Sequence, residues 1–370
     1  MDFRYLTPIV YPSRFANRLQ VIKMSEAFSG YCRTFILYVR DIRVDLKKIF
    51  SQYNVSRAFN IKALGSSFGF PRSFFFAFRA QKLIFLEPDA VWFMRDGLLA
   101  YWLTFLTDLK NKNFFFEAHS FERLPKFIYR RVFNFSRGII TTNNNKAKDI
   151  EKFFGVPKEK IFVALNGVDI NIFSNLLPPR TARFRLKLPD DKNLAVYTGT
   201  PSRDKGINVL LEAAGLLPEN IRIISVGGSK NDIEMLKNEK NFDKIHWIPQ
   251  VSHDKIPDYL AAADILVAPF SGKNSWTTLY TSPLKIPEYL ASGKAIVISD
   301  LPSVREFVSD NEVFFFKADD AADLAQTIEG VLKNSEIMLQ KGNRAKIKAR
   351  DYSWHRRAKT IIEFIEKYKK

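Results

Sequence analysis

Cysteine and long apolar runs are both scarce in this sequence of 370 residues. Cys32 is the single cysteine, so no disulfide can form within the chain, which suits a reducing compartment. The apolar run Leu98–Leu106 is about half the roughly 18 residues that a membrane-spanning helix needs. The first residues, MDFRYLTPIV, lack the basic, apolar and small-residue segments of a secretion signal. We therefore expect a cytoplasmic protein that does not cross a membrane.

Acidic residues are outnumbered by basic ones, chiefly in the first half of the chain. The formal net charge is +18; residues 1–173 carry 27 Lys and Arg against 14 Asp and Glu, whereas residues 174–370 carry 30 against 25. Phenylalanines accompany the basic residues in segments 71–79 (PRSFFFAFR) and 126–133 (KFIYRRVF). This combination favours peripheral contact with an anionic membrane surface. A solvated basic surface and phenylalanines that fill the core stay open as alternatives.

Several other ligand classes are disfavoured. The sequence contains no recognisable helix-turn-helix, RNA-recognition or zinc module, so we expect no nucleic-acid partner despite the positive charge. It also contains no Asp-X-Asp sequence and no His/Cys cluster with metal-ligand spacing. We therefore expect neither an obligatory metal nor another cofactor.

The chain length and the 46% hydrophobic content favour two domains. Short β-rich runs alternate with amphipathic helical stretches, which predicts parallel sheets covered by helices on both faces. In the second half the predicted strands are Leu194–Thr198, Arg222–Val226, Ile245–Ile248, Ile265–Ala268, Ala295–Ile298 and Val313–Phe316. In the first half they are Phe3–Leu6, Thr34–Tyr38, Leu83–Leu86, Val91–Met94, Asn113–Ala118 and Gly138–Thr142. The predicted fold class is α/β, with two Rossmann-like, doubly wound domains facing a cleft.

Paired prolines mark the predicted boundary between the domains. Pro178 and Pro179 interrupt helices and strands and stiffen a connection. We accordingly assign residues 1–175 to an N-terminal domain, 176–190 to a linker and 191–350 to a C-terminal domain. Residues 351–370 are expected to form a final helix that packs back toward the N-terminal domain.

Two segments of the second half carry residues suited to binding an anion. Residues 199–206 join the first strand of this half to its first helix, and Arg203 and Lys205 there supply two cations. The segment matches neither the GxGxxG fingerprint nor the Walker loop, which disfavours the usual nucleotide cofactors. Further along, Ser282 is a good N-cap and Pro283 a good first residue of a short helix. The free N–H groups at such a helix start can bind a phosphate or sugar hydroxyls.

Taken in order, the motifs of nearly the whole chain resemble family 4 of the retaining glycosyltransferases. In the second half they are segments 197–206 (YTGTPSRDKG), 259–264 (YLAAAD), 282–293 (SPLKIPEYLASG) and 299–302 (SDLP). In the first half and at the end they are 117–119 (EAH), 166–169 (NGVD) and 352–354 (YSW). The resemblance implies the GT-B fold and sugar transfer, with retention, from a nucleotide-diphosphate-sugar. It also implies a role in making cell-envelope polysaccharide or glycolipid.

The same resemblance implies roles for individual residues. Lys205 would neutralise the donor diphosphate with Arg203 as a helper, and Glu288 would bind the ribose hydroxyls. His119 would meet the donor sugar near the reacting carbon. The remaining donor contacts would come from Gly199, Thr200, Ser282, Pro283 and Leu284.

Residues 11–23 carry the predicted acceptor side. Ser13 can cap a helix whose apolar side faces the sheet. This leaves Arg14, Asn17 and Arg18 available to the cleft. A plain amphipathic helix explains the same pattern equally well. The acceptor is unidentified, and a lipid-linked acceptor at an anionic membrane is one alternative.

Two positions depart from the family's pattern. Tyr280 stands where many relatives carry the first of two glutamates, so the contact to the donor sugar is left unassigned. Thr200 stands where relatives carry an arginine, which shifts phosphate binding toward Lys205 and Arg203. A sugar-nucleotide epimerase of the same fold and a catalytically inactive sugar-nucleotide binder therefore stay open as alternatives. A phosphorylase is disfavoured, because no pyridoxal-binding lysine motif is recognisable.

Overall fold

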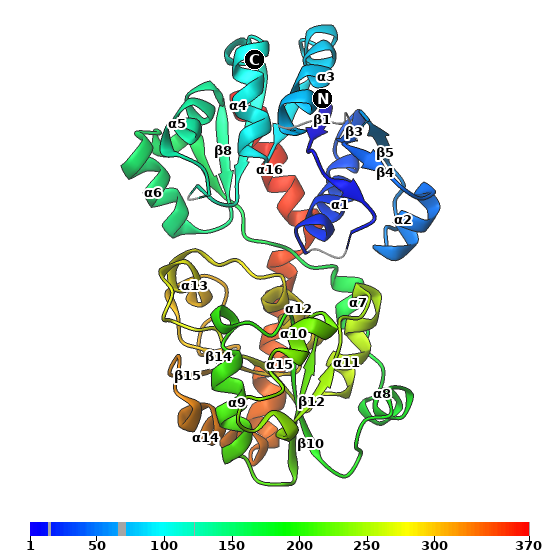
Figure 1. The fold of residues 1–370 in the computed structure, drawn as a ribbon, viewed down its shortest axis with the longest axis vertical. Helices are drawn as coiled ribbons and strands as arrows, with labels where there is room; N and C mark the ends of the chain where they lie inside the picture. The colour runs from blue at the N-terminus through cyan, green and yellow to red at the C-terminus, as the bar shows by residue number, and fades with distance from the viewer. Residues whose placement is uncertain (14–15, 66–71, 122, 370) are drawn as a thin grey trace. The chain divides into compact units, whose positions relative to one another are not determined.

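The computed structural model describes residues 1–13, 16–65, 72–121 and 123–369. The chain divides into two compact units (Figure 1). The first consists of Met1–Leu165 and Trp354–Lys370, and the second of Asn166–Ser353. Residues 176–190, expected as a linker, lie in the second unit and include helix α8 (Pro179–Leu186). The final helix, α16 (Trp354–Tyr368), belongs to the first unit.

The first unit is built on a parallel sheet. Among the described residues this sheet has seven strands in the order β5-β3-β1-β6-β7-β8-β9. Their bounds are β1 (Asp2–Leu6), β3 (Thr34–Val39), β5 (Asn60–Ala63), β6 (Val91–Met94), β7 (Asn113–Ala118), β8 (Gly138–Thr141) and β9 (Ile161–Val163). Every residue of β7 is buried, as expected of a strand covered on both faces. The strand order reverses between β1 and β6, and ligands of open α/β sheets bind at such a point.

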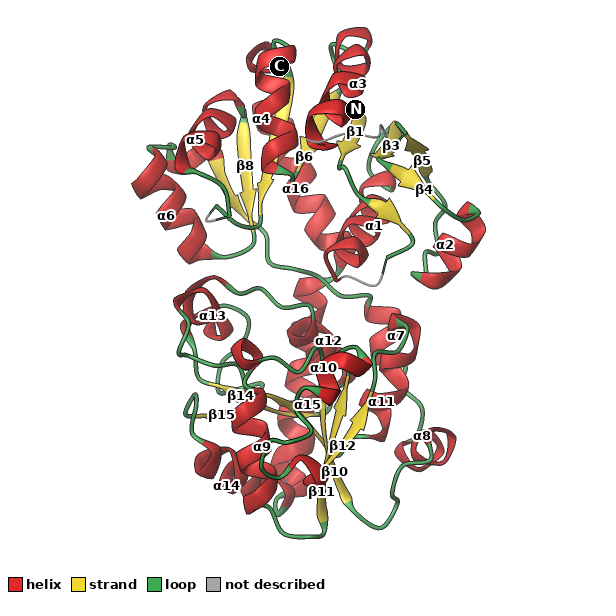
Figure 2. Cartoon of the chain, in the orientation of Figure 1, coloured by secondary structure: helices red, strands yellow, loops and turns green. Residues whose placement is uncertain are grey.

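Helices cover the first sheet, and two short strands form a separate parallel pair (Figure 2). The helices are α1 (Ala16–Ser29), α2 (Leu46–Gln52), α3 (Arg72–Leu86), α4 (Gly97–Leu106), α5 (Lys126–Phe135), α6 (Asn144–Phe154) and the returning α16. The paired strands are β2 (Val10–Tyr11) and β4 (Asp41–Ile42). Helix α1 packs against α16, and α4 packs between α3 and α5. Within the described residues, no helix is long and apolar enough to cross a membrane.

One predicted strand of the first unit is wrong. Residues Leu83–Leu86 form the last turn of α3. The buried side chains of this helix include Phe76, Ala80 and Ile84, which recur at every fourth position and therefore lie along one helical face. A four-residue apolar run cannot be told from a segment of buried helix by its own sequence. Here the four-residue spacing of the buried positions along residues 76–84 identifies the run as part of a helix.

The second unit contains another parallel sheet. Within the described residues its six strands follow the order β12-β11-β10-β13-β14-β15. Their bounds are β10 (Asn193–Thr198), β11 (Ile221–Val226), β12 (Ile245–Ile248), β13 (Ile265–Ala268), β14 (Ala295–Ser299) and β15 (Phe314–Phe316). The order reverses between β10 and β13, so the candidate loop at residues 199–206 leaves the sheet at its switch point.

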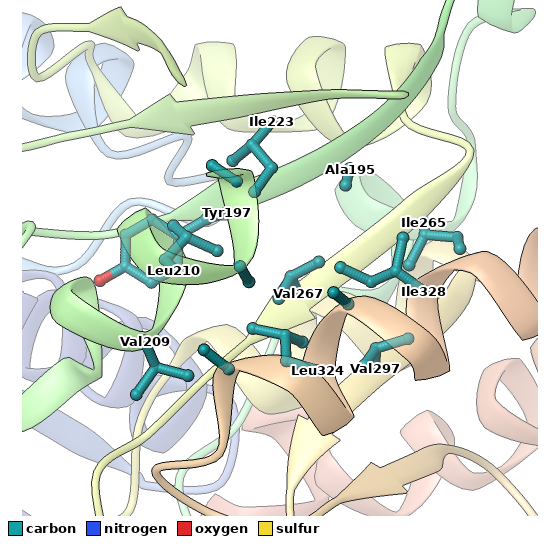
Figure 3. Close-up of a cluster of buried hydrophobic side chains, with 14 of the residues drawn as sticks. Ala195, Tyr197, Val209, Leu210, Ile223, Ile265, Val267, Val297, Leu324 and Ile328 are labelled. Atoms are coloured by element: carbon teal, nitrogen blue, oxygen red, sulfur yellow. The ribbon is translucent and has the colours of Figure 1, made fainter. Parts of the chain in front are cut away.

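A continuous apolar core joins the second sheet to α9 and α14 (Figure 3). Leu210 of α9 and Leu324 of α14 pack with Tyr197, Ile223 and Val267 of the sheet, and all five are buried. The helices of this unit are α7 (Ile170–Ser174), α8, α9 (Ile207–Leu216), α10 (Lys230–Glu234), α11 (Ile256–Ala262), α12 (Lys285–Ser292), α13 (Pro302–Arg305), α14 (Ala321–Leu332) and α15 (Ser335–Ala349).

The predicted start of α12 is wrong by two residues. The helix begins at Lys285, after Leu284, and not at Pro283. Ser282 does not cap it, because the Oγ and the carbonyl oxygen of Ser282 accept hydrogen bonds from the backbone N–H and Nδ2 of Asn166, at 3.4 and 2.5 Å. Gly293 ends the helix with a φ of 70°, as predicted.

A buried ion pair fastens α16 to the sheet of the first unit. The guanidinium of Arg357 donates to Oε1 of Glu117 at the end of β7, at 2.6 Å, and both side chains are almost fully buried. The same guanidinium donates to the carbonyl oxygens of Ala164 and Leu165, at 3.2 and 2.8 Å. Burial would raise the pKa of Glu117, but its interactions with His119 and with the positive charge of Arg357 outweigh burial, and the pKa lies well below its usual value.

Replacing Arg357 should strongly destabilise the first unit. Arg357→Ala leaves the Glu117 carboxylate buried without its cation, so we expect a loss of about 3–5 kcal/mol in the free energy of unfolding, measured by urea denaturation. Lys359→Ala on the same helix is the matched control, because Lys359 forms only an exposed pair with Glu363. It should change stability by less than about 0.5 kcal/mol. Equal effects of the two substitutions would contradict the anchoring role.

Candidate functional site

Glycines bring three loops of the second unit into close contact. Gly227, after β11, has a φ of 133°, and a Cβ there would lie 2.5 Å from the carbonyl oxygen of Gly199. Gly206 has a φ of 75°, and a Cβ there would lie 1.4 Å from the carbonyl oxygen of Pro269, after β13. No larger side chain fits these positions without moving the backbone. The loops after β10, β11 and β13 are therefore held together at the switch point.

Residues 199–206 form a compact turn that carries both predicted cations. The hydroxyl of Tyr197 donates to the carbonyl oxygen of Thr200 at 2.8 Å, and residues 203–205 form one turn of 3₁₀ helix. Arg203 is exposed and Lys205 is half-buried, so both can meet a ligand from solvent. The geometry is consistent with a phosphate loop at the carboxyl end of a strand.

Lys285 is a candidate that the sequence analysis missed. It is the first residue of α12 and only 8% exposed. Its Nζ lies 3.8 Å from the ring centre of Tyr197, and a Cβ placed on Gly199 would lie 3.2 Å from the same atom. Burial lowers the pKa of Lys285 well below its usual value, and the nearby charge of Lys205 adds to the effect. The signal in the sequence was a lysine between apolar neighbours in 284–287 (LKIP).

Glu288 is held by a histidine that the sequence did not single out. Oε1 of this carboxylate lies 2.7 Å from Nε2 of His253, and Glu288 is 8% exposed. The ring of Phe173 packs beside that imidazole, with 5.4 Å between ring centres. Glu288 therefore presents a fixed carboxylate on α12, one turn after Lys285.

His119 lies at the carboxyl end of β7 in the first unit. Its Nε2 is 3.2 Å from Oε2 of Glu117, and the imidazole is 23% exposed. Burial lowers the pKa of His119 to about 4, and the positive charge of Arg95 acts in the same direction. The imidazole is therefore neutral at pH 7, and the Glu117–Arg357 pair fixes the strand end from which it projects.

Two of the predicted acceptor-side residues, Ser13 and Asn17, lie near the start of α1. Another, Arg14, lies outside the described residues. Asn17 is exposed and its carbonyl oxygen accepts from Arg95 at 3.4 Å. The backbone N–H of Ser13 donates to the hydroxyl of Tyr53 at 2.8 Å. The same region contains Arg95, whose guanidinium also bonds to Gln20.

Three arginines of the first unit lie close enough for their charges to interact. Burial lowers the pKa of Arg18, and the positive charges of Arg95 and Arg40 lower it further. Arg40 and Arg95 directly follow β3 and β6, the strands on either side of β1. This concentration of cations at the carboxyl edge of the sheet suits an anionic ligand.

The second unit thus brings together Gly199, Thr200, Arg203 and Lys205 with the first turns of α12. Ser282, Pro283 and Leu284 precede that helix, with Ser282 tied to Asn166. His119, Ser13 and Asn17 belong to the first unit. Within the part of the chain that the structure describes, no group of three or more His, Cys, Asp or Glu side chains is placed to hold a metal ion. Metal independence stays a prediction.

Two family models match consecutive parts of the chain. The model described as Glycosyltransferase Family 4 matches residues 45–172, and the model described as Glycosyl transferases group 1 matches residues 179–351. The chain belongs to the family 4 glycosyltransferases. The first match begins after β1 and β3, and the second includes the whole second sheet and the loop 199–206.

Curated relatives match over parts of their length. A D-inositol 3-phosphate glycosyltransferase of Xylanimonas cellulosilytica is 27% identical over 188 residues, covering 48% of this chain and 43% of the relative. The putative teichuronic acid biosynthesis glycosyltransferase TuaC of Bacillus subtilis is 25% identical over 202 residues, covering 54% of this chain and 48% of the relative. The chain therefore spans about half the length of the curated relatives it matches.

Solved structures match over the whole fold of this family 4 glycosyltransferase. Anabaena HepE in complex with UDP gives a TM-score of 0.77 with 14% identity, covering 99% of this chain and 100% of that chain. This likeness confirms the predicted GT-B fold class, with two parallel-sheet α/β domains.

The pKa of His119 predicts a specific pH dependence of stability. The folded-state pKa of about 4 lies below the ordinary histidine value of 6.5, so the unfolded chain binds a proton more readily between these values. Stability should therefore fall as the pH is lowered from about 6.5 toward 4. His119→Asn removes this contribution, so the difference in urea midpoint between pH 7.5 and 5 should shrink in the variant. An unchanged difference would show that His119 titrates normally in the folded protein.

Proposed function

We propose that the protein transfers a glycosyl group from a nucleoside-diphosphate sugar to an acceptor hydroxyl, with retention of the anomeric configuration. The observation that carries this proposal is the loop 199–206, where Arg203 and Lys205 stand at the switch point of the second sheet beside the fixed carboxylate of Glu288. The UDP bound in the HepE structure supports a nucleotide-sugar as the ligand. No metal takes part in the proposed reaction.

The proposed reaction places its largest charge on the departing diphosphate. The bond between the sugar C1 and the donor phosphate oxygen breaks, and the oxygen keeps the electron pair. The acceptor oxygen bonds to C1 on the same face, and its proton passes to the diphosphate. Lys205 and Arg203 stabilise the charge that develops there, while Glu288 binds the ribose hydroxyls. His119, neutral at pH 7, contacts the donor sugar.

The acceptor side of the proposal rests on the arginines of the first unit. Arg18, Arg40 and Arg95 favour an acceptor that carries a phosphate or another anionic group. The relatives named for inositol 3-phosphate transfer and for teichuronic acid biosynthesis support an acceptor of this kind in cell-envelope synthesis. A lipid-linked acceptor combines an anionic group with presentation at a membrane.

Replacing Lys205 should remove most of the activity without unfolding the protein. Lys205→Ala should lower turnover of the active nucleotide-sugar by about 10²-fold or more, because it removes charge stabilisation at the departing diphosphate. Lys240→Ala, at an exposed position of the same unit, is the control and should keep wild-type turnover. The assay incubates UDP-, GDP-, dTDP- and ADP-sugars with acceptor extracts and detects released nucleotide by mass.

The same assay separates the competing enzyme classes. Near-normal turnover in Lys205→Ala would refute the role of this lysine. Conversion of the sugar without release of nucleotide would identify an epimerase instead of a transferase. Binding of a nucleotide-sugar with no product in any reaction would favour the inactive binder. The anomeric configuration of the transferred sugar, read by NMR, tests retention.

We further propose that helices α3, α4 and α5 dock on an anionic membrane surface. Their sequences contain no Asp or Glu. The phenylalanines of segment 71–79 differ in exposure, since Phe76 is buried whereas Phe78 is 56% exposed. Further along α3, Phe85 is 80% exposed and lies seven residues after Phe78, on the same side of the helix. Exposed Lys82 lies between them, so the outward side of α3 is both apolar and basic.

The neighbouring helices extend this apolar and basic surface. Phe105 of α4 is 56% exposed and Phe127 of α5 is 62% exposed. The ring of Tyr101 contacts both, at 5.1 and 6.1 Å between ring centres, and the guanidinium of Arg131 stacks on Phe105 at 3.8 Å. Exposed aromatic rings flanked by cations can enter the headgroup region while the cations bind acidic lipids.

Vesicle sedimentation tests the membrane surface. The protein should sediment with phosphatidylglycerol-containing vesicles, stay in solution with phosphatidylcholine alone, and be released by high salt, because charge attraction decays over about 8 Å at physiological ionic strength. Phe78→Ser with Phe85→Ser, and separately Lys82→Glu with Arg130→Glu, should each weaken sedimentation. Phe184→Ser is the matched control, since Phe184 is 85% exposed in the second unit. No sedimentation with acidic vesicles at low salt would refute the docking surface and favour a soluble acceptor.

A further inference from the structure

The side chain of Lys285 is buried without a hydrogen-bond partner. Among the described residues, Nζ of Lys285 finds no acceptor, although the side chain is inside the second unit. A buried amine is expensive unless it is hydrogen-bonded or paired with an anion. Lys294, a half-buried lysine of the same unit, shows the usual arrangement: its Nζ donates to the carbonyl oxygens of Ala261 and Ala263, at 2.9 and 2.7 Å.

Aromatic rings and a glycine direct the Lys285 amine toward the candidate phosphate loop. Nζ lies 3.8 Å from the ring centre of Tyr197 and 5.1 Å from that of Phe270. The backbone of Gly199 is close by, and a methyl group there would come within 3.2 Å of Nζ. The absence of a side chain at Gly199 therefore leaves the amine open to a group seated on this loop.

The charges around Lys285 also favour an anion. Lys205, on the same loop, is close enough to influence the titration of Lys285, so two lysines approach one another. Glu288 and Asp204 contribute the opposite sign, but Glu288 is already paired with His253 at 2.7 Å. Two neighbouring ammonium groups repel each other unless an anion lies between them.

We infer that Lys285 is a third cation for the donor diphosphate and reaches the loop at Gly199 from α12. This inference rests on the proposed function and adds a residue to its donor site. Thr200 carries no charge where relatives have an arginine. Lys285 provides from the helix the cation that this position lacks. The amine is held ready by Tyr197 and Phe270 and gains its hydrogen-bond acceptors only when phosphate oxygens arrive.

This arrangement couples diphosphate binding to proton uptake. Burial lowers the pKa of Lys285 in the free protein, which favours the neutral amine. An adjacent diphosphate favours the charged form, and the amine takes up a proton as the ligand binds. In the free protein, an apolar side chain in place of Lys285 should not lower the stability, because it removes an unpaired polar group from the interior.

Calorimetric titration of the intact protein with UDP, pyrophosphate and uridine tests the inference. Measured at pH 8 in two buffers of different ionisation enthalpy, Lys285→Met should bind UDP and pyrophosphate roughly 10- to 100-fold more weakly than wild type, and proton uptake should fall. Uridine, which has no phosphate, should bind both proteins equally. Lys294→Met is the matched control and should keep wild-type affinity and proton uptake. Without ligand, Lys285→Met should unfold at the same temperature as wild type or higher.

The possible outcomes separate this inference from the proposed function. If the wild-type protein bound neither UDP nor pyrophosphate, the proposed donor site would fail, and the role of Lys285 with it. If the wild type bound them and Lys285→Met bound equally well with the same proton uptake, only the role of Lys285 would be refuted. A lower unfolding temperature of the free Lys285→Met protein would assign the lysine to the fold and would also overturn the inference.

Discussion

The close approach of backbone segments at the switch point of the second sheet is the constraint on which the candidate donor site depends. Gly206 lets the loop after β10 touch the carbonyl of Pro269, and Gly227 lets the loop after β11 touch Gly199. Without these contacts the turn that carries Arg203 and Lys205 would have no fixed position beside α12. The position of the candidate site residues therefore depends on glycines, which have no side chain to keep the loops apart.

Both units contain charged groups in their interiors, and the two cases differ in how the charge is satisfied. Glu117 is buried in the first unit, but its Oε1 accepts a hydrogen bond from the buried guanidinium of Arg357. Lys285 in the second unit has aromatic neighbours and no acceptor among the described residues. A buried pair of opposite charges makes each charge depend on the other, whereas a buried cation without an acceptor favours an anionic ligand.

The sequence predicted most of the sheet framework, because parallel strands buried on both faces are continuous apolar runs. Strands β6, β7, β12 and β13 occupy the predicted residues. Strands β5 and β9 were missed, since β5 alternates polar and apolar residues and β9 is only three residues long. The ordered motifs located the loop 199–206, but the ion-pair partners of buried charged residues could not be predicted. Glu117 and Arg357 are 240 residues apart, and only the fold brings them together.

The first unit is discontinuous in the sequence, because its last helix follows the whole of the second unit. A chain emerging from the ribosome can therefore complete the sheet of the second unit before α16 exists. Until residues 354–370 are made, Glu117 has no guanidinium and α1 lacks the helix that packs against it. A chain that stops short of α16 would leave the Glu117 carboxylate without the Arg357 guanidinium and one face of α1 uncovered. The contacts of the first unit are therefore complete only after α16 has been made.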